Sequence, residues 1–510
     1  MNNLNFLVDV LKESPVFKTL EKNVKPGRTV CASGLSTINK SNIIYALCRL
    51  KGVTAFCLAS DEKEAQTLCN DLSCMGLRAY VYPVRDFNFL DFQSRSHEYE
   101  HARLKVLLKL INHECDVAIA CVDAAAQLTV PKNVLEQSVI EFEEGRELSL
   151  EKATKALTLL GYERFDAVEG SGQFSLRGGI LDFFMPDSDY PVRCEFWGDE
   201  ITDLSYFDIE TQRRFKKADK ITLSPSTEIV IEDRAALADK IEHKAKLLRS
   251  KNSTKAKEKL FSEAELIRSG AMIANADKFI NQIYDKPESL FDYLDRNTLV
   301  FASEFTAIQE RGKSMDFISN ETLMQGFEDG TLCRGFDRFA LTFNECTEFL
   351  QSHGTIVLEN FVHGSMPIKL SEIISFSTKQ LSAWGGSYKQ LKEDVDGLFT
   401  PESKGVIFAG TERAAKNLCD TFNADGINAV YSEGADKISK GELLVMQGAL
   451  SAGFEYPSQK FFAITYSQVS YRPEKSKKKK KKAGQEIYSL SELAPGDYVV
   501  HNVHGIGVFG

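Results

Sequence analysis

Apolar runs alternate with helical patterns through the first part of the chain, and this alternation constrains the fold more than any other feature. The runs "GVTAFCLAS", "LRAYVYP" and "CDVAIACVDAAA" have the length and composition of strands, and "DEKEAQTLCNDLSCMG" and "EYEHARLKVLLKLIN" have helical spacing between them. Strands that are joined by helical crossovers run in the same direction. The sequence therefore predicts an α/β fold with a parallel sheet and helices on its faces.

The pattern changes near residue 135, where short strands broken by turns replace the alternation. Charged helical sequence follows from about 233 to 285, and "TLVFASEF" then returns to a strand. We interpret this order as one α/β domain interrupted by an inserted antiparallel β-rich domain and followed by a second α/β domain. The predicted limits are 1–134 and 213–385 for the first α/β domain, 135–212 for the insertion, 386–470 for the second α/β domain, 471–487 for a Lys-rich linker and 488–510 for a terminal β unit.

A chain of 510 residues is long enough for several domains, and its composition is that of a globular protein. A formal net charge of −10 argues against a protein that coats nucleic acid through a uniformly basic surface. The cysteines form no C-x-x-C pair of zinc-site spacing, and the nearest pair, Cys69 and Cys74, is too far apart. Because the chain has no basic leader and no long apolar run, we expect a soluble, cytoplasmic protein without membrane contact.

The stretch "GLSTINKS" has most of a phosphate-binding P-loop, which is spelled G-x-x-x-x-G-K-[ST] and lies between a strand and a helix. Gly34, Lys40 and Ser41 are in register, but Asn39 stands where the second glycine belongs. Asn tolerates a positive φ, so the backbone could still turn. Its side chain, however, takes up space where the backbone must close on a nucleotide.

The second half of a nucleotide site is also altered. A Mg²⁺-binding strand of this type ends in an Asp-Glu pair, in which the Asp holds the metal. In "TLVFASEF", Ser303 stands at the Asp position beside Glu304. A neutral hydroxyl holds Mg²⁺ poorly, so we interpret the loop as a vestige. The chain is expected to bind no nucleotide or metal cofactor and to contain no catalytic residue.

The segment "VRCEFWGDEI" alternates with a period of two, which is typical of a strand with one buried face. One face would carry Val192, Cys194 and Phe196, and the other Arg193, Glu195 and Trp197. An aromatic side chain beside arginine has the composition of an interface hot spot. Alternatively, Trp197 covers a helix of its own domain and Arg193 pairs with Glu195. Nearby, Gly178-Gly179 is expected to form a bulge and Gly198-Asp199 a turn.

Three segments carry a resemblance to a known family. "GQFSLRGGILDFF", "YPVRCEFWGDEI" and "FDIETQRR" resemble the segment shared by the bacterial excision-repair protein UvrB and the transcription-repair coupling factors. The terminal "PGDYVVHNVHGIGVFG" resembles the start of the RNA polymerase-interacting domain, which coupling factors have and UvrB lacks. "GFEYPSQKFFAITYSQV" and the basic linker after it resemble the coupling-factor segment before that domain. The chain thus resembles the N-terminal part of a coupling factor.

The resemblance implies a function in nucleotide excision repair. In the family the inserted domain docks UvrA, and the contact positions correspond to Arg177, Arg193 and Trp197, with Trp197 replacing a more usual Phe. We expect all three side chains to be open to solvent. The terminal segment would be a truncated Tudor-like β-barrel. The full-length protein would bind the RNA polymerase β subunit and translocate on double-stranded DNA with an ATP- and Mg²⁺-dependent motor, which we expect to lie outside this chain.

Other interpretations remain open from the sequence. The chain could be a UvrB-type ATPase, which would require a competent nucleotide site, or a transcription regulator with the same terminal polymerase-binding pattern. The run Lys477 to Lys482 could be a solvated linker, or an arm that binds phosphates without sequence preference. His501 and His504 are expected to be structural, not metal ligands.

Overall fold

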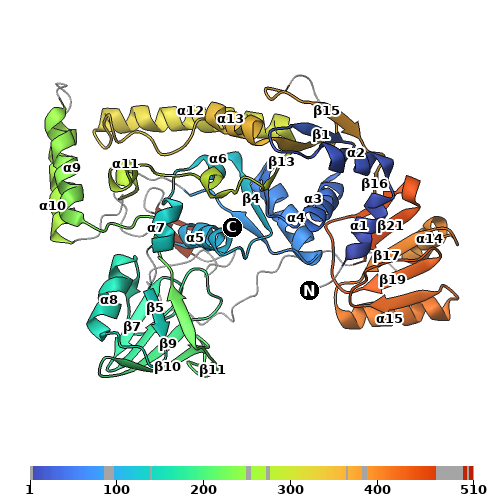
Figure 1. The fold of residues 1–510 in the computed structure, drawn as a ribbon, viewed down its shortest axis with the longest axis horizontal. Coiled ribbons are helices and arrows are strands. Elements are labelled where there is room, and N and C mark those ends of the chain that lie inside the picture. Colours follow the sequence, from blue (N-terminus) through green and yellow to red (C-terminus); the bar gives the residue numbers. More distant parts are fainter. Residues whose placement is uncertain are drawn as a thin grey trace.

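The computed structural model describes residues 4–85, 97–137, 140–248, 254–270, 276–362, 366–381, 388–466, 498–501 and 505–508. Its centre is a seven-stranded sheet in which every paired strand is parallel, in the order β15-β1-β14-β13-β2-β4-β3 (Figure 1). The strands are β1 (Val30–Ser33), β2 (Ala55–Ala59), β3 (Ala79–Tyr82), β4 (Val117–Cys121), β13 (Leu299–Ser303), β14 (Thr355–Leu358) and β15 (Glu372–Ser375). The predicted parallel α/β sheet is confirmed.

Helices cover both faces of this sheet. They are α1 (Asn5–Lys12), α2 (Pro15–Asn23), α3 (Thr37–Lys51), α4 (Glu62–Cys74), α5 (Glu98–Ile111), α6 (Val122–Ala126), α7 (Lys132–Gln137), α12 (Phe305–Asp329) and α13 (Phe343–His353). Asp61 caps α4 by accepting a hydrogen bond from the Glu64 amide at 2.7 Å. Strands β1, β2 and β4 are buried at every position, as expected for parallel strands with both faces covered.

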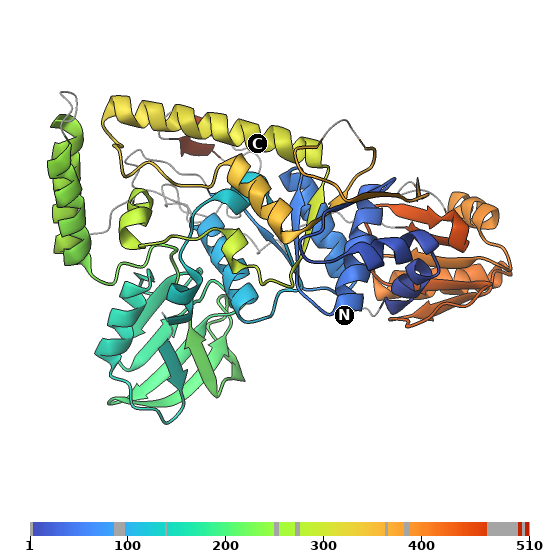
Figure 2. The same ribbon diagram turned by 45° about the horizontal axis from the view of Figure 1, so that its top comes forward.

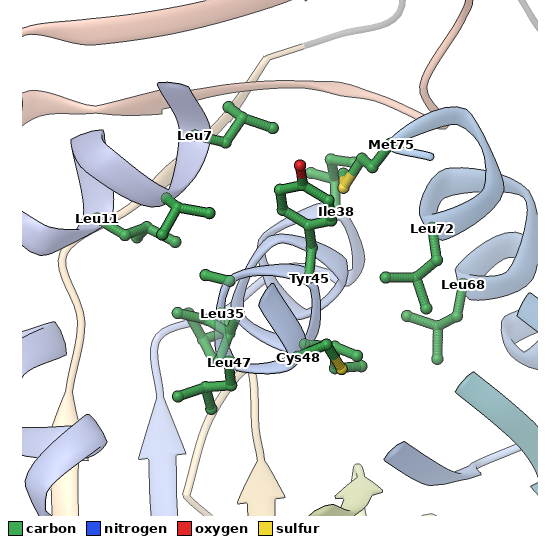
Figure 3. Close-up of a cluster of buried hydrophobic side chains, with 14 of the residues drawn as sticks. Leu7, Leu11, Leu35, Ile38, Tyr45, Leu47, Cys48, Leu68, Leu72 and Met75 are labelled. Carbon is green, nitrogen blue, oxygen red and sulfur yellow. The ribbon is translucent and has the colours of Figure 1, made fainter. Parts of the chain in front are cut away.

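Helix α3 lies inside the domain, not on its surface. Its residues from Ile38 to Cys48 are all buried. Figure 3 looks along this helix and shows α1 side chains on one side and α4 side chains on the other. The labelled members of this core are Leu7, Leu11, Leu35, Ile38, Tyr45, Leu47, Cys48, Leu68, Leu72 and Met75. A helix enclosed in this way cannot shift without breaking the core around it.

The insertion is a separate, mainly antiparallel unit, in which β6 pairs with β7 in parallel. Its six-stranded sheet has the order β11-β10-β9-β8-β7-β6, and a second pair joins β12 to β5. The elements are β5 (Ile140–Glu143), α8 (Leu150–Leu159), β6 (Glu163–Arg164), β7 (Gln173–Arg177), β8 (Ile180–Phe183), β9 (Val192–Trp197), β10 (Glu200–Phe207), β11 (Arg214–Lys217) and β12 (Lys220–Leu223). Figure 1 shows this unit standing below α5 and α7.

Two turns of the insertion test the expectations about its glycines. Gly198-Asp199 links β9 to β10, as predicted. Gly178-Gly179 is not a bulge; it is the two-residue turn of the β7–β8 hairpin, with Gly178 at φ +62°. The register shifts of this sheet lie in β10 instead, between Ile201 and Asp203 and between Tyr206 and Phe207.

Charged helical sequence follows the insertion, as predicted. Helices α9 (Arg234–Leu247) and α10 (Thr254–Ser269) pack together through Leu237, Ile241, Leu260 and Ala264. They stand at one end of the molecule, beside the tip of α12, in both ribbon views (Figures 1 and 2). The short helices are η2 (Ala276–Phe279), α11 (Ile280–Ile283) and η3 (Leu290–Tyr293).

The second α/β domain lies at the opposite end (Figures 1 and 2). Its mixed sheet has the order β16-β20-β21-β17-β19-β18. The elements are β16 (Lys379–Leu381), α14 (Tyr388–Leu398), β17 (Lys404–Phe408), α15 (Glu412–Ala424), β18 (Ala429–Ser432), β19 (Glu442–Met446), β20 (Gly453–Tyr456), η4 (Pro457–Gln459) and β21 (Phe461–Thr465). One sheet face packs on α14 and α15, and the other shares a core with α1 and α3 of the first domain.

Near the end of the chain, β22 (Tyr498–His501) and β23 (Gly505–Val508) pair antiparallel, which agrees with the two strands predicted there. The lysine run Lys477–Lys482 and His504 lie outside the described residues. Of the helices that the structure describes, none combines the length and the apolar composition that crossing a membrane requires.

Candidate functional site

The carboxyl ends of β1, β13 and β14 bring the residues of the altered P-loop together. Lys40, near the start of α3, is 2% exposed and points at the end of β13. Its ammonium group donates to Ser303 Oγ at 2.8 Å and to Glu304 Oε1 at 2.6 Å. Segments more than 260 residues apart in the sequence thus meet at one edge of the sheet, where ligands of open α/β sheets bind.

Two acidic residues that sequence reasoning missed complete this cluster. Glu64 Oε1 lies 3.3 Å from the Lys40 ammonium and accepts a hydrogen bond from Ser303 Oγ at 2.6 Å. Glu359, at the end of β14, accepts from the Phe305 amide at 2.7 Å. Carboxylates thus surround the cation that would otherwise bind phosphate oxygens. Lys40 already has internal anionic partners, so a nucleotide would have to displace them.

The backbone amides of the loop also form hydrogen bonds within the protein. The Gly34 amide donates to the Asn360 carbonyl and the Leu35 amide to the Glu359 carbonyl, each at 3.1 Å. Gly34 has φ +78°, and a Cβ there would lie 2.2 Å from the Phe376 carbonyl oxygen, so only glycine fits. A working P-loop needs amides that point at phosphates. These two amides instead tie the loop to its neighbours.

The remaining loop residues face the protein interior. Asn39 is fully buried, and its side-chain oxygen accepts from Ser36 Oγ at 2.7 Å. Ser41 Oγ donates to Asp71 Oδ2 at 3.3 Å. Asp71 in turn accepts from the amide and the hydroxyl of Ser451, both at 2.7 Å, and Ser451 belongs to the second α/β domain. The hydroxyl that would bind Mg²⁺ in a P-loop is therefore part of a domain contact.

Burial and charge set the pKa values in this cluster. Burial, together with the neighbouring Glu304 carboxylate, raises the pKa of Glu359 to about 7. Burial also raises the pKa of Asp71, to about 6, although the Ser451 and Ser41 hydrogen bonds oppose this. Burial acts in the same direction on Glu64, but Lys40 and the Ser303 and Ser60 hydroxyls outweigh it and lower the pKa of Glu64. One acid of the cluster is thus held ionised by Lys40, and another readily takes up a proton.

The raised pKa of Glu359 predicts a pH-dependent stability. The folded protein holds this proton more tightly than the unfolded chain, so the contribution is fully present below the ordinary pKa of a glutamate and is lost as the pH rises through about 7. Glu359→Gln stays neutral at every pH. Between pH 5 and pH 8, we expect the wild type to lose roughly 2 kcal/mol of unfolding free energy relative to this variant. Urea unfolding of both proteins at several pH values measures the difference, and parallel pH profiles would contradict the assignment.

The second candidate site is the outer face of the inserted sheet. Val192, Cys194 and Phe196 of β9 are buried, whereas Trp197 is 82% exposed. Arg177, at the end of β7, is 49% exposed and donates to Asp182 Oδ2 at 2.7 Å. The alternation predicted for β9 is therefore observed. The alternative in which Trp197 covers a helix of its own domain is wrong.

Arg193 differs from the expectation. It lies on the same face, but its side chain is only 13% exposed, so it is not open to solvent. Its guanidinium donates to both oxygens of Asp182, at 2.7 and 2.8 Å, and stacks 4.4 Å from the Phe207 ring centre. It does not pair with Glu195, which contacts Arg214 instead. The alternation of the sequence gives the face on which a residue lies, but not how much its neighbours cover it.

The insertion is thus a small, mainly antiparallel sheet that stands within an α/β domain and exposes a face with arginine and tryptophan, the composition of an interaction surface. Residues 140–229 match the family model of the UvrB interaction domain. The match contains the whole six-stranded sheet and therefore the exposed face that carries Trp197.

The chain as a whole is similar to transcription-repair-coupling factors, and the resemblance predicted from the sequence is confirmed. It is 28% identical over 515 residues to that of Bacillus subtilis strain 168, covering 98% of this chain and 43% of the relative. The factor of Staphylococcus epidermidis is 26% identical over 451 residues, which cover 84% of this chain and 37% of the relative. That of Staphylococcus aureus strain MRSA252 is 23% identical over 518 residues, which cover 99% of this chain and 44% of the relative. The chain spans less than half the length of these relatives.

Proposed function

We propose that this chain recruits UvrA as the N-terminal part of a transcription-repair coupling factor in nucleotide excision repair. The observation that carries the proposal is the exposure of Trp197 at the end of β9, on the arginine-bearing face of the sheet and inside the segment that matches the UvrB interaction domain. A large aromatic side chain that a monomer leaves in solvent is the kind of residue that dominates an interface. Calorimetric titration of purified UvrA into the chain tests the proposal: saturable binding supports it, and the absence of binding rejects it.

The partners of the whole protein are part of the same proposal. The relatives are named for coupling transcription to repair, and we infer that the whole protein contacts the RNA polymerase β subunit, with the terminal β segment opening the polymerase-interacting domain. ATP-driven translocation on double-stranded DNA would be the work of a motor in the remaining length of such a factor. In this account the present chain supplies the recruitment function.

We propose further that the altered P-loop binds no nucleotide. The proposal is supported by three contacts within the protein: the Lys40 ammonium binds a carboxylate, the loop amides donate to backbone carbonyls, and the Ser41 hydroxyl donates to Asp71. Of the alternatives considered, a UvrB-type ATPase would need these groups free for phosphate and Mg²⁺, and a short polymerase-binding regulator would not carry the UvrB-like part of the chain.

This proposal predicts that Mg²⁺-ATP leaves the thermal stability unchanged. A ligand that binds the folded state raises its stability by RT ln(1 + [L]/Kd), so millimolar ATP would shift the melting temperature if it bound with micromolar affinity. Differential scanning fluorimetry with MgCl₂ alone, and with MgCl₂ and ATP, measures the effect. A rise of several degrees that requires ATP would mean that the cluster around Lys40 opens.

A further inference from the structure

Asp182 occupies an unusual position on the candidate docking face. It lies in the middle of β8 on the outer side of the sheet, yet its side chain is only 1% exposed. Both of its carboxylate oxygens accept from arginines: Oδ1 from Arg193 Nε at 2.7 Å, and Oδ2 from Arg193 at 2.8 Å and from Arg177 at 2.7 Å. A buried carboxylate is costly unless it is paired, so this one depends on its two arginines.

Arg193 fixes Asp182 from the other side. Its Nη1 donates to the Gln212 carbonyl at 3.1 Å, and its Nη2 lies 3.3 Å from Gln212 Oε1. Gln212 is held in a left-handed conformation, at φ +58°, and its amide donates to the Asp208 carbonyl at 2.7 Å. Phe207, fully buried, supports the guanidinium plane from below. Arg193 is thus locked between a strand, a turn and a ring, and its five donors are largely spent on its own domain.

Arg177 is held differently. It reaches Asp182 through one amino group, and half of its side chain remains in solvent. Because Arg193 pairs with Asp182 in a bidentate geometry and neutralises it, the charge of Arg177 is the one that the cluster offers outward. The single contact to Asp182 limits where that charge can lie.

We propose that Asp182 is a positioning residue of the docking surface: it orients Arg177 toward a carboxylate-bearing surface of UvrA, and Arg193 anchors Asp182. This inference rests on the proposed function. Arginine side chains carry much rotamer entropy, and a fixed guanidinium binds a partner with a smaller entropic loss than a free one. The exposed contact residues of this face are then Arg177 and Trp197.

For the Asp182→Asn variant, the proposal and simple charge attraction predict opposite changes in the affinity for UvrA. Asp182→Asn removes a negative charge and makes the face more positive, so attraction alone would tighten binding to an acidic partner surface. Loss of orientation should instead weaken binding about 10-fold, through faster dissociation, while the association rate stays the same or rises. Glu195→Gln is the matched control: it removes one negative charge from the same face but leaves both arginines with Asp182. We expect its affinity to stay within about 2-fold of the wild type.

Surface plasmon resonance with immobilised UvrA tests these expectations. Asp182→Asn should add no further weakening in an Arg177→Ala background, because the two residues act through one contact. Arg193→Lys provides a second variant if Asp182→Asn does not fold, since it keeps the charge but cannot span Asp182 and Gln212; it too should dissociate about 10-fold faster. Unchanged or tighter binding by Asp182→Asn or Arg193→Lys, or full weakening in the Arg177→Ala background, would overturn the inference. If the wild type does not bind UvrA, the proposed function fails instead.

Discussion

Lys40→Ala is expected to destabilise the first α/β domain by about 3 to 5 kcal/mol, because removing one partner of a buried ion pair leaves the opposite charges uncompensated. The Lys40 ammonium is the cation between Glu64 and Glu304, and Glu359 lies beside them. Without it, the carboxylates face one another at the buried N-terminal end of α3 with no cation between them. Urea unfolding followed by far-ultraviolet circular dichroism measures the loss.

A lysine pair on the surface provides the control for this variant. Lys155 pairs with Glu151 across one turn of α8, and both side chains are exposed, so Lys155→Ala should have little effect. In a working P-loop the lysine side chain binds the phosphates of the nucleotide. If Lys40→Ala were as stable as Lys155→Ala, Lys40 would not be the structural cation described above.

Trp197→Ala is expected to weaken UvrA binding about 30-fold or more, since truncation of a central aromatic anchor typically costs 2 kcal/mol or more. The side chain is 82% exposed and contributes little to the core of its own domain. The variant should therefore fold as the wild type does, and the loss should belong to the interface alone. Isothermal titration calorimetry with UvrA gives the ratio of affinities.

Phe317 is the matched control for this variant. It is another aromatic side chain with high exposure, 67%, but it lies on α12, away from the inserted sheet. Phe317→Ala should bind UvrA with the affinity of the wild type. Equal losses in the two variants would show that exposed aromatics in general, not this face, determine binding.

The positions of strands and helices in the α/β domains could be predicted because their signals are local. A buried parallel strand such as β2 needs only a short apolar run, and α4 begins at a residue, Asp61, whose carboxylate caps the helix. The glycine pair at 178–179 was harder, because a bulge and a two-residue turn use the same residues. Only the pairing of β7 with β8 distinguishes them.

The set of residues that meet at Lys40 was harder to predict, because it depends on the order of the strands in the sheet, which is a long-range property. Gly34, Lys40, Ser303 and Glu304 could be named from motif spacing, but Glu64 and Glu359 could not. Glu359 follows directly after β14, so the rule that parallel strands end at one edge could have found it. Phe207 and Gln212 cover the Arg193 side chain because of a register shift in β10 and the turn that follows this strand. The sequence around Arg193 contains no local pattern that predicts these contacts.

Hydroxyl-radical footprinting of the chain, alone and saturated with UvrA, tests whether UvrA binds over Trp197, because it reports where the partner lies on the surface. Trp197 and Phe317 are both exposed and both react with radicals, so each serves as a reference for the other. We expect UvrA to slow the oxidation of Trp197 several-fold and to leave that of Phe317 unchanged. Unchanged oxidation of Trp197 in the complex, or protection of Phe317 in its place, would contradict this expectation.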